Sequence, residues 1–131
     1  MFATGGLGGV HRGGGGWDVS ADLTELGRTR VAVISGGCKG FLDVAATLEY
    51  LETQGVGVFT LADGREGRVD YPAFWSRESG CASPGVVADE EEAARIIRET
   101  LPGIEVALIV FRRAVLAAAA QWAPFCGSDT P

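Results

Sequence analysis

Residues 18–43, DVSADLTELGRTRVAVISGGCKGFLD, contain the features that decide the fold. Within this stretch, residues 31–35 form a short apolar run rich in β-branched side chains, which predicts a buried strand. A glycine-rich turn follows and carries Lys39, the only lysine of the protein. A helical pattern starts directly after the turn. This order places Lys39 outside the carboxyl end of a strand, where α/β sheets bind their ligands.

Lys39 has two interpretations. A single lysine is usually a solvated surface group. However, arginine outnumbers lysine ten to one in this chain, and Lys39 lies among glycines beside an apolar strand. Partial desolvation would lower the pKa of such an amine and make it a usable nucleophile. The chemistry of the residues alone leaves the nucleophile and the surface group equally open.

The segments on either side of this strand predict further elements. Residues 18–27 fit a short helix that has Ser20 as its N-cap. Residues 41–54 carry apolar side chains at helical spacing, with Phe41 at the start of the buried stripe. A second strand is predicted over residues 56–61. The order strand, helix, strand implies a right-handed parallel unit.

The second half of the chain is less regular. Residues 62–70 predict a polar loop, and residues 71–80 a loop whose three aromatic side chains either pin it to the core or form a lid or subunit contact. Residues 89–98 begin a helix with acidic side chains at its start and arginines later. Residues 104–111 fit a strand and residues 112–122 a helix, on propensity. The whole pattern predicts an α/β fold with a mainly parallel sheet flanked by helices.

Composition limits the classes of function. The 131 residues are 47% hydrophobic, enough for one domain with a core, and the net charge of −6 argues against a nucleic-acid partner. The cysteines, at positions 38, 81 and 126, fit neither a metal spacing nor a disulfide framework. Reduced thiols in a cytoplasmic protein are the expectation. Two arginines interrupt the apolar residues 104–122, which make a poor membrane span.

The chain opens with a glycine-rich segment. Residues 2–4 fit the end of a strand, and eight of the first sixteen residues are glycine. Such a segment either brings bare backbone N–H groups to an anion or is a flexible tail. Asp18 follows it, and a single carboxylate completed by waters would suit Mg²⁺ or Mn²⁺. Ser20 and Asp22 have a purely structural interpretation as well, because both residue types favour a helix start.

The chain also carries longer motifs in a fixed order. They are TGGLGGVHR at residues 4–12, DVSADL at 18–23, ELGRT at 25–29, SGGCK at 35–39 with LD at 42–43, TLEYLETQGV at 47–56, and YPAF at 71–74 with SRESG at 76–80. In this order the motifs resemble those of the pseudouridine-5′-phosphate glycosidase family. The resemblance covers about residues 2–98, which match the central part of the family.

The resemblance implies a function and a set of site residues. The family cleaves the C–C glycosidic bond of pseudouridine 5′-phosphate, giving uracil and ribose 5-phosphate, and uses a divalent metal, typically Mn²⁺. Its α/β fold assembles as a homotrimer. By resemblance, Lys39 is the catalytic nucleophile, which forms a Schiff base with C1′ of the opened sugar. Asp18 is the metal carboxylate, and Ser20, Ala21 and Asp22 bind the substrate.

The chain departs from the family pattern at both ends. Family members are longer, and the family's general acid, a glutamate near the N-terminus, has no counterpart here. The match fades after about Arg98, so residues 1–103 are expected to be the glycosidase-like region and residues 104–131 a divergent C-terminal segment. A fragment, incomplete relative to the family fold, is one explanation. A truncated non-catalytic remnant, or a phosphate-binding or interaction module, is the alternative function.

Overall fold

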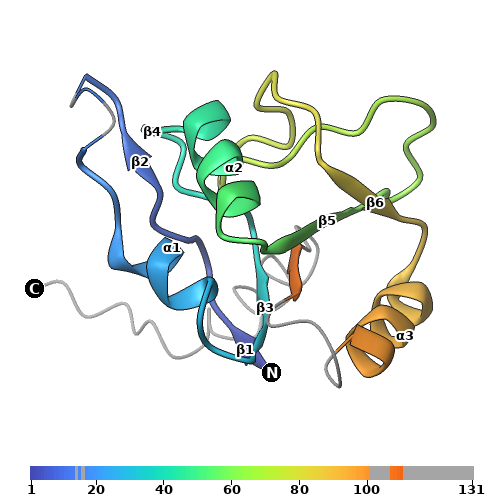
Figure 1. Cartoon of the computed structure of the whole chain (residues 1–131). Coiled ribbons are helices and arrows are strands. Elements are labelled where there is room, and N and C mark those ends of the chain that lie inside the picture. The colour runs from blue at the N-terminus through green and yellow to red at the C-terminus, as the bar shows by residue number, and fades with distance from the viewer. Residues whose placement is uncertain (14, 16, 101–106, 111–131) are drawn as a thin grey trace, which may run out of the picture.

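A computed structural model describes residues 1–13, 15, 17–100 and 107–110 (Figure 1). In this part of the chain, five strands form one sheet in which all paired strands are parallel. Their spatial order is β1 (Phe2–Ala3), β3 (Ala32–Ser35), β7 (Ala107–Val110), β5 (Gly57–Leu61) and β6 (Gly85–Val87). Helices flank the sheet, so the predicted α/β class with a mainly parallel sheet is confirmed.

Three helices of the described chain pack against the sheet: α1 (Ala21–Leu26), α2 (Val44–Thr53) and α3 (Glu90–Thr100). Successive side chains of a strand point to opposite faces of the sheet. Val33 therefore packs in the larger core with α1 and α2, whereas its neighbour Ile34 packs in a smaller core with α3. The sheet is a middle layer with helices on both of its faces.

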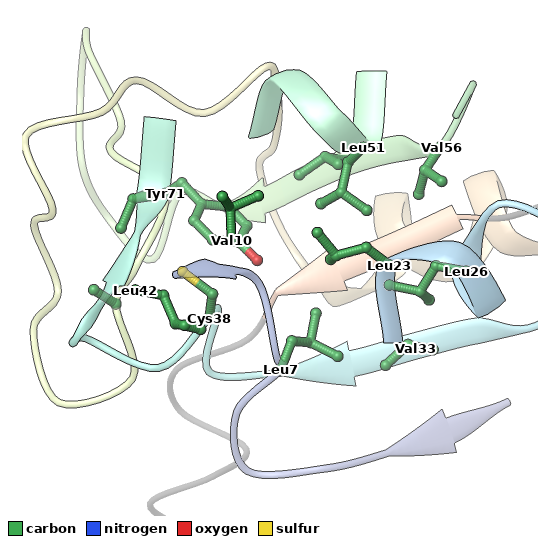
Figure 2. Close-up of a cluster of buried hydrophobic side chains, with 13 residues drawn as sticks. Leu7, Val10, Leu23, Leu26, Val33, Cys38, Leu42, Leu51, Val56 and Tyr71 are labelled. Carbon is green, nitrogen blue, oxygen red and sulfur yellow. The ribbon is translucent and has the colours of Figure 1, made fainter. Parts of the chain in front are cut away.

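The larger core fills the space beneath α1 and α2 (Figure 2). Its members Leu23 of α1 and Leu51 of α2 are fully buried. Leu7 brings the glycine-rich N-terminal segment into this core, and Cys38 brings in the turn that follows β3. The residues around Lys39 are thus attached to the core of the molecule.

A second, two-stranded sheet lies beside the main one. β2 (Val10–His11) pairs antiparallel with β4 (Leu42–Asp43). The helix predicted to start at Phe41 therefore begins three residues later, at Val44. Asp43 is its N-cap, because its Oδ1 accepts the N–H of Ala46 at 3.0 Å. The prediction for Phe41 was wrong: its side chain is 62% exposed.

Other predicted elements are confirmed with small shifts, including α1 with its Ser20 cap, β3, β5, α3 and a strand within residues 104–111. β6 was not predicted from the sequence. Gly85 is in fact required in this strand, since an added Cβ would lie 2.6 Å from the Phe59 ring. The helix predicted over residues 112–122 lies outside the described residues.

β7 lies between β3 and β5 and pairs with both. The strands β3 and β5 are therefore parallel but not adjacent, although they follow one another along the chain with α2 between them. The boundary predicted at residues 103/104 stays a prediction. None of the helices described reaches the combination of length and apolar character that spanning a bilayer requires.

Candidate active site

Lys39 lies on a turn whose backbone is bound to the N-terminal glycine segment. The N–H of Lys39 donates to the carbonyl of Leu7 at 3.1 Å, and the N–H of Leu7 donates to the carbonyl of Gly37 at 2.9 Å. One step earlier, the N–H of Gly36 donates to the carbonyl of Gly5 at 2.8 Å. These bonds extend the pairing of β1 and β3 beyond the strand ends. The main chain therefore fixes the position of Lys39.

Neighbouring side chains on this turn point in opposite directions. Cys38 is fully buried, and burial raises the pKa of its thiol from 9.0 to about 11. Lys39 is exposed and, among the residues described, forms no ion pair. Lys39 lines a pocket of about 380 Å³. The other residues around this pocket are Gly6, Gly40, Phe41, Phe74 and Trp75.

A hairpin places Asp18 and Ser20 on the other side of the glycine segment. The N–H of His11 donates to the carbonyl of Asp18 at 2.8 Å, and the N–H of Ser20 donates to the carbonyl of Gly9 at 3.0 Å. Val10 and Val19 form an antiparallel bridge between these two bonds. The glycine segment thus connects the turn of Lys39 with the residues that precede α1.

Ser20 and Asp22 surround Gly8. Ser20 Oγ accepts the N–H of Asp22 at 3.3 Å as the N-cap of α1, and Asp22 Oδ2 accepts the N–H of Gly8 at 2.8 Å. A Cβ at Gly8 would overlap Ser20 Oγ and lie 2.9 Å from Asp22 Oδ2. The structural interpretation of both residues is therefore confirmed. Their role in substrate binding, like that of exposed Ala21, stays a prediction.

Asp18 lies on the exposed rim of the hairpin. Its side chain is 68% exposed, and its Oδ2 lies 3.9 Å from Nδ1 of His11. In the described chain, no three His, Cys, Asp or Glu side chains gather as they would around a fully protein-ligated metal. A carboxylate and an imidazole are suitable donors for Mn²⁺. The residues present would therefore suit a largely hydrated cation, for which Asp18 stays the predicted carboxylate ligand.

Thr47 links the glycine segment to α2 and was not predicted to serve the site. The N–H of Val10 donates to Thr47 Oγ1 at 3.0 Å, and Thr47 Oγ1 donates to the carbonyl of Asp43 at 2.6 Å. An added Cβ at Gly9 would lie 2.5 Å from Thr47 Oγ1. A sequence signal was available, since Thr47 is a polar residue at a buried position of the helix stripe.

Residues 71–76 pack against the turn of Lys39. Tyr71 is fully buried, and burial raises the pKa of its hydroxyl well above the ordinary value. Ala73 forms a bridge with Gly37, and the N–H of Phe74 donates to the carbonyl of Gly36 at 3.0 Å. The interpretation of this loop as pinned to the core is confirmed for Tyr71. Trp75, by contrast, is 82% exposed.

Comparison with known proteins identifies the family. The sequence profile described as indigoidine synthase A like protein matches residues 1–121. The chain belongs to this family. The match to the indigoidine synthase A like profile runs beyond residues 2–98, which carry the motif resemblance.

Among the relatives of this indigoidine synthase A like chain are curated pseudouridine-5′-phosphate glycosidases. The protein of Deinococcus radiodurans is 54% identical over 99 residues, which are 75% of this chain and 30% of the relative. The protein of Chloroflexus aurantiacus is 56% identical over 99 residues, 75% of this chain and 31% of the relative. The resemblance to this group is confirmed, and the chain spans less than a third of these relatives.

A solved structure supports the fold. The prealnumycin C-glycosynthase AlnA, in complex with ribulose 5-phosphate, matches with a TM-score of 0.73 and 33% identity. The match covers 96% of this chain and 44% of AlnA. The indigoidine synthase A like chain therefore shares its α/β architecture with part of a larger protein.

Proposed function

We propose that this chain carries the nucleophile of a pseudouridine-5′-phosphate glycosidase, which converts pseudouridine 5′-phosphate to uracil and ribose 5-phosphate. The observation that carries the proposal is the position of Lys39. Lys39 lines a pocket beyond the carboxyl end of β3, on a turn fixed by backbone bonds to the glycine segment. The curated relatives of this name, 54% and 56% identical, support the same substrate class.

In this proposal, the Lys39 amine attacks C1′ of the opened sugar and forms a Schiff base. The new N–C1′ bond lets the nitrogen lone pair drive cleavage of the C–C bond to uracil, which leaves with the electron pair and takes up a proton at that carbon. Water then hydrolyses the resulting iminium, which releases ribose 5-phosphate and the free Lys39 amine. A short turn suits this role, because positioning the reacting atoms is itself a large part of catalysis. The backbone bond between Lys39 and Leu7 would hold the amine in place while its exposed side chain reaches the sugar.

The remaining site residues extend the proposal. Ser20, Ala21 and Asp22 would bind the substrate, with one oxygen of Asp22 retained by Gly8. Asp18 would hold Mn²⁺ or another divalent cation, assisted by His11. Such an ion, when bound, neutralises charge on a phosphorylated substrate. A homotrimer in the cytoplasm is part of the same proposal, by resemblance to the family.

Reductive trapping tests the assignment of Lys39. The chain is incubated with ribose 5-phosphate and sodium borohydride, and the adduct is located by peptide mass spectrometry. We expect one sugar on Lys39, and because the chain has no other lysine, only the N-terminal amine competes. Lys39→Arg keeps the charge and should abolish the adduct. A sugar found on the N-terminus alone, or an equal yield in K39R, would contradict the nucleophile assignment.

Turnover of the chain on its own is expected to be low. The general acid of the family has no counterpart in this sequence, and general acid–base catalysis commonly contributes about 10²- to 10⁴-fold. Trapping is therefore a sharper test than an assay of uracil release.

A non-catalytic binding module is the second candidate. The exposure of Phe41 and Trp75 at one pocket favours it, because apolar side chains exposed together mark interaction surfaces. This candidate predicts binding of inorganic phosphate or ribose 5-phosphate without any covalent adduct. Calorimetric titration beside the trapping experiment separates the two functions.

A further inference from the structure

Three aromatic residues line the same pocket as Lys39. The pocket of about 380 Å³ has Phe41, Phe74 and Trp75 among its six lining residues, and Lys39 is its only charged member. Its volume lies in the range of roughly 300–1,000 Å³ that is typical of small-molecule sites. Trp75 and Phe41 are 82% and 62% exposed, although residues of this size and character are usually covered. The pocket therefore offers uncovered aromatic surface beside residue Lys39.

The aromatic side chains are held in place by the same backbone that fixes Lys39. Phe74 has a φ of +54°, a region that side-chain-bearing residues rarely adopt. Its N–H donates to Gly36, in the turn that carries Lys39. Its ring lies against the glycine segment, where an added Cβ at Gly6 would come within 2.8 Å of it. Strained backbone of this kind persists only where the surrounding structure holds it, and it concentrates at functional sites.

Two of the three rings are in direct contact, and Phe41 lies separately against the ring of His11. Phe74 and Trp75 meet edge to face, with their centroids 4.5 Å apart. This leaves the exposed ring of Trp75 free to receive a further planar group. Among the described residues of the lining, Lys39 is the single charged group, and the rest of the surface is aromatic rings and glycine backbone. A flat, uncharged heterocycle suits this surface better than the sugar phosphate does.

We propose that Phe41, Phe74 and Trp75 form a stacking wall that binds the planar pyrimidine of the substrate while the Lys39 amine reacts with the adjoining sugar. This inference rests on the proposed function and assigns base-binding residues to it. Trp75 provides the main stacking surface, and Phe74 supports it from the side of the glycine segment. Base–aromatic stacks are tolerant of sequence and orientation because every base has a π-face.

Uracil binding tests the wall. We expect the full chain to bind uracil, as measured by saturation-transfer NMR and calorimetry. Trp75→Ala should weaken binding roughly 5- to 150-fold, the loss expected for one stack, whereas Trp75→Phe should retain most of the affinity. Phe41→Ala provides a second variant, and both residues are exposed enough that truncation leaves the core unchanged. Trp17→Ala is the matched control, because Trp17 is 92% exposed and lies outside the pocket lining.

The outcomes separate this inference from the proposed function. No uracil binding by the full chain, or equal affinity in Trp75→Ala and Trp17→Ala, would overturn the stacking wall even if ribose 5-phosphate still traps on Lys39. Absence of the Lys39 adduct, with uracil binding intact and sensitive to Trp75, would overturn the proposed function alone. If sedimentation shows that Trp75→Ala dissociates an oligomer and uracil does not bind, the wall is a contact between copies and the inference fails.

Discussion

Gly8 and Gly9 allow the N-terminal segment to pass directly over the starts of two helices. At Gly8, the space that a side chain would need is taken by Ser20 and Asp22 from the start of α1. At Gly9, it is taken by Thr47 from the first half of α2. These two positions therefore require glycine because the neighbouring helix residues leave no space for a side chain, and not because the backbone must be flexible. The interpretation of the glycine-rich start as a flexible tail fails for this pair.

Thr47 offers a test at the scale of a single residue. Thr47→Val removes the hydroxyl that accepts the buried N–H of Val10. We expect a loss of about 1–3 kcal/mol in the free energy of unfolding, because that N–H would remain buried without a partner. Urea unfolding measures this loss, and amide hydrogen exchange follows the protection of Val10 directly.

Thr47→Ser is the matched control. It retains the hydroxyl, so protection of the Val10 amide should persist, while the missing methyl group costs about 1 kcal/mol. A Thr47→Val protein that is as stable as the parent, with Val10 still protected, would show that this hydrogen bond does not hold the glycine segment.

The loop of residues 71–76 and the turn of Lys39 act as one element. An antiparallel bridge joins Gly37 to Ala73, and a Cβ on Gly37 would overlap the carbonyl oxygen of Pro72. Gly37 also has a φ of +89°, which only glycine adopts without strain. The placement of the aromatic wall therefore depends on this one position as much as on the aromatic residues themselves.

Two glycine substitutions separate strain from close contact. Gly37→Ala should destabilise the fold by more than Gly55→Ala, because both positions have positive φ but only Gly37 has a neighbour in the way. We expect about 1–2 kcal/mol for Gly55→Ala, the ordinary cost of a left-handed residue, and a larger loss for Gly37→Ala. Urea unfolding gives both values. Equal losses would mean that the loop moves away from the turn at little cost.

Most elements could be predicted from sequence, and the errors have identifiable causes. The start of α2 was placed at Phe41 because the helical spacing of apolar residues extends from α2 back to that position. Spacing does not reveal that Asp43 caps the helix or that β4 pairs with β2. β6 was missed because three residues that begin with a glycine are too short for a strand pattern. These boundaries depend on partners that lie far away in the sequence.

At the scale of the whole molecule, the larger core contains a thiol and a phenol, those of Cys38 and Tyr71, which burial keeps protonated. Burial raises the pKa of Cys38 from 9.0 to about 11, and it also raises the pKa of Tyr71, with a smaller contribution from Cys38. In the unfolded chain both groups ionise near their ordinary values. Both pKa values are higher in the folded state, so the corresponding stability is complete below about pH 9 and is lost as pH rises further.

Alkaline unfolding tests this linkage. Between pH 9 and 11, the shift of Cys38 alone predicts a loss of roughly 2–3 kcal/mol in the free energy of unfolding. Urea titrations at several pH values measure it. Cys38→Ala should start from a lower stability but fall less steeply over the same range, with Tyr71 still contributing. Parallel curves for the two proteins would contradict the burial of a protonated thiol.

The sequence alone determined the α/β class, the turn of Lys39 and the motif series of the pseudouridine-5′-phosphate glycosidases. These features are local, because strand and helix periodicity, caps and motif order are read along a continuous segment. The residues predicted for the site were chosen on the same basis, and their catalytic, substrate and metal roles remain predictions.

Only the tertiary structure decided which of these segments meet. Some contacts join residues that are far apart in the chain, namely Gly9 with Thr47 and Gly6 with Phe74. The place of β7 between β3 and β5 likewise joins distant segments. The exposed aromatic wall beside Lys39 also depends on such contacts. The physical reason is that close packing and cross-chain hydrogen bonds are set by the whole fold, whereas the sequence pattern reports only which face of each segment is apolar.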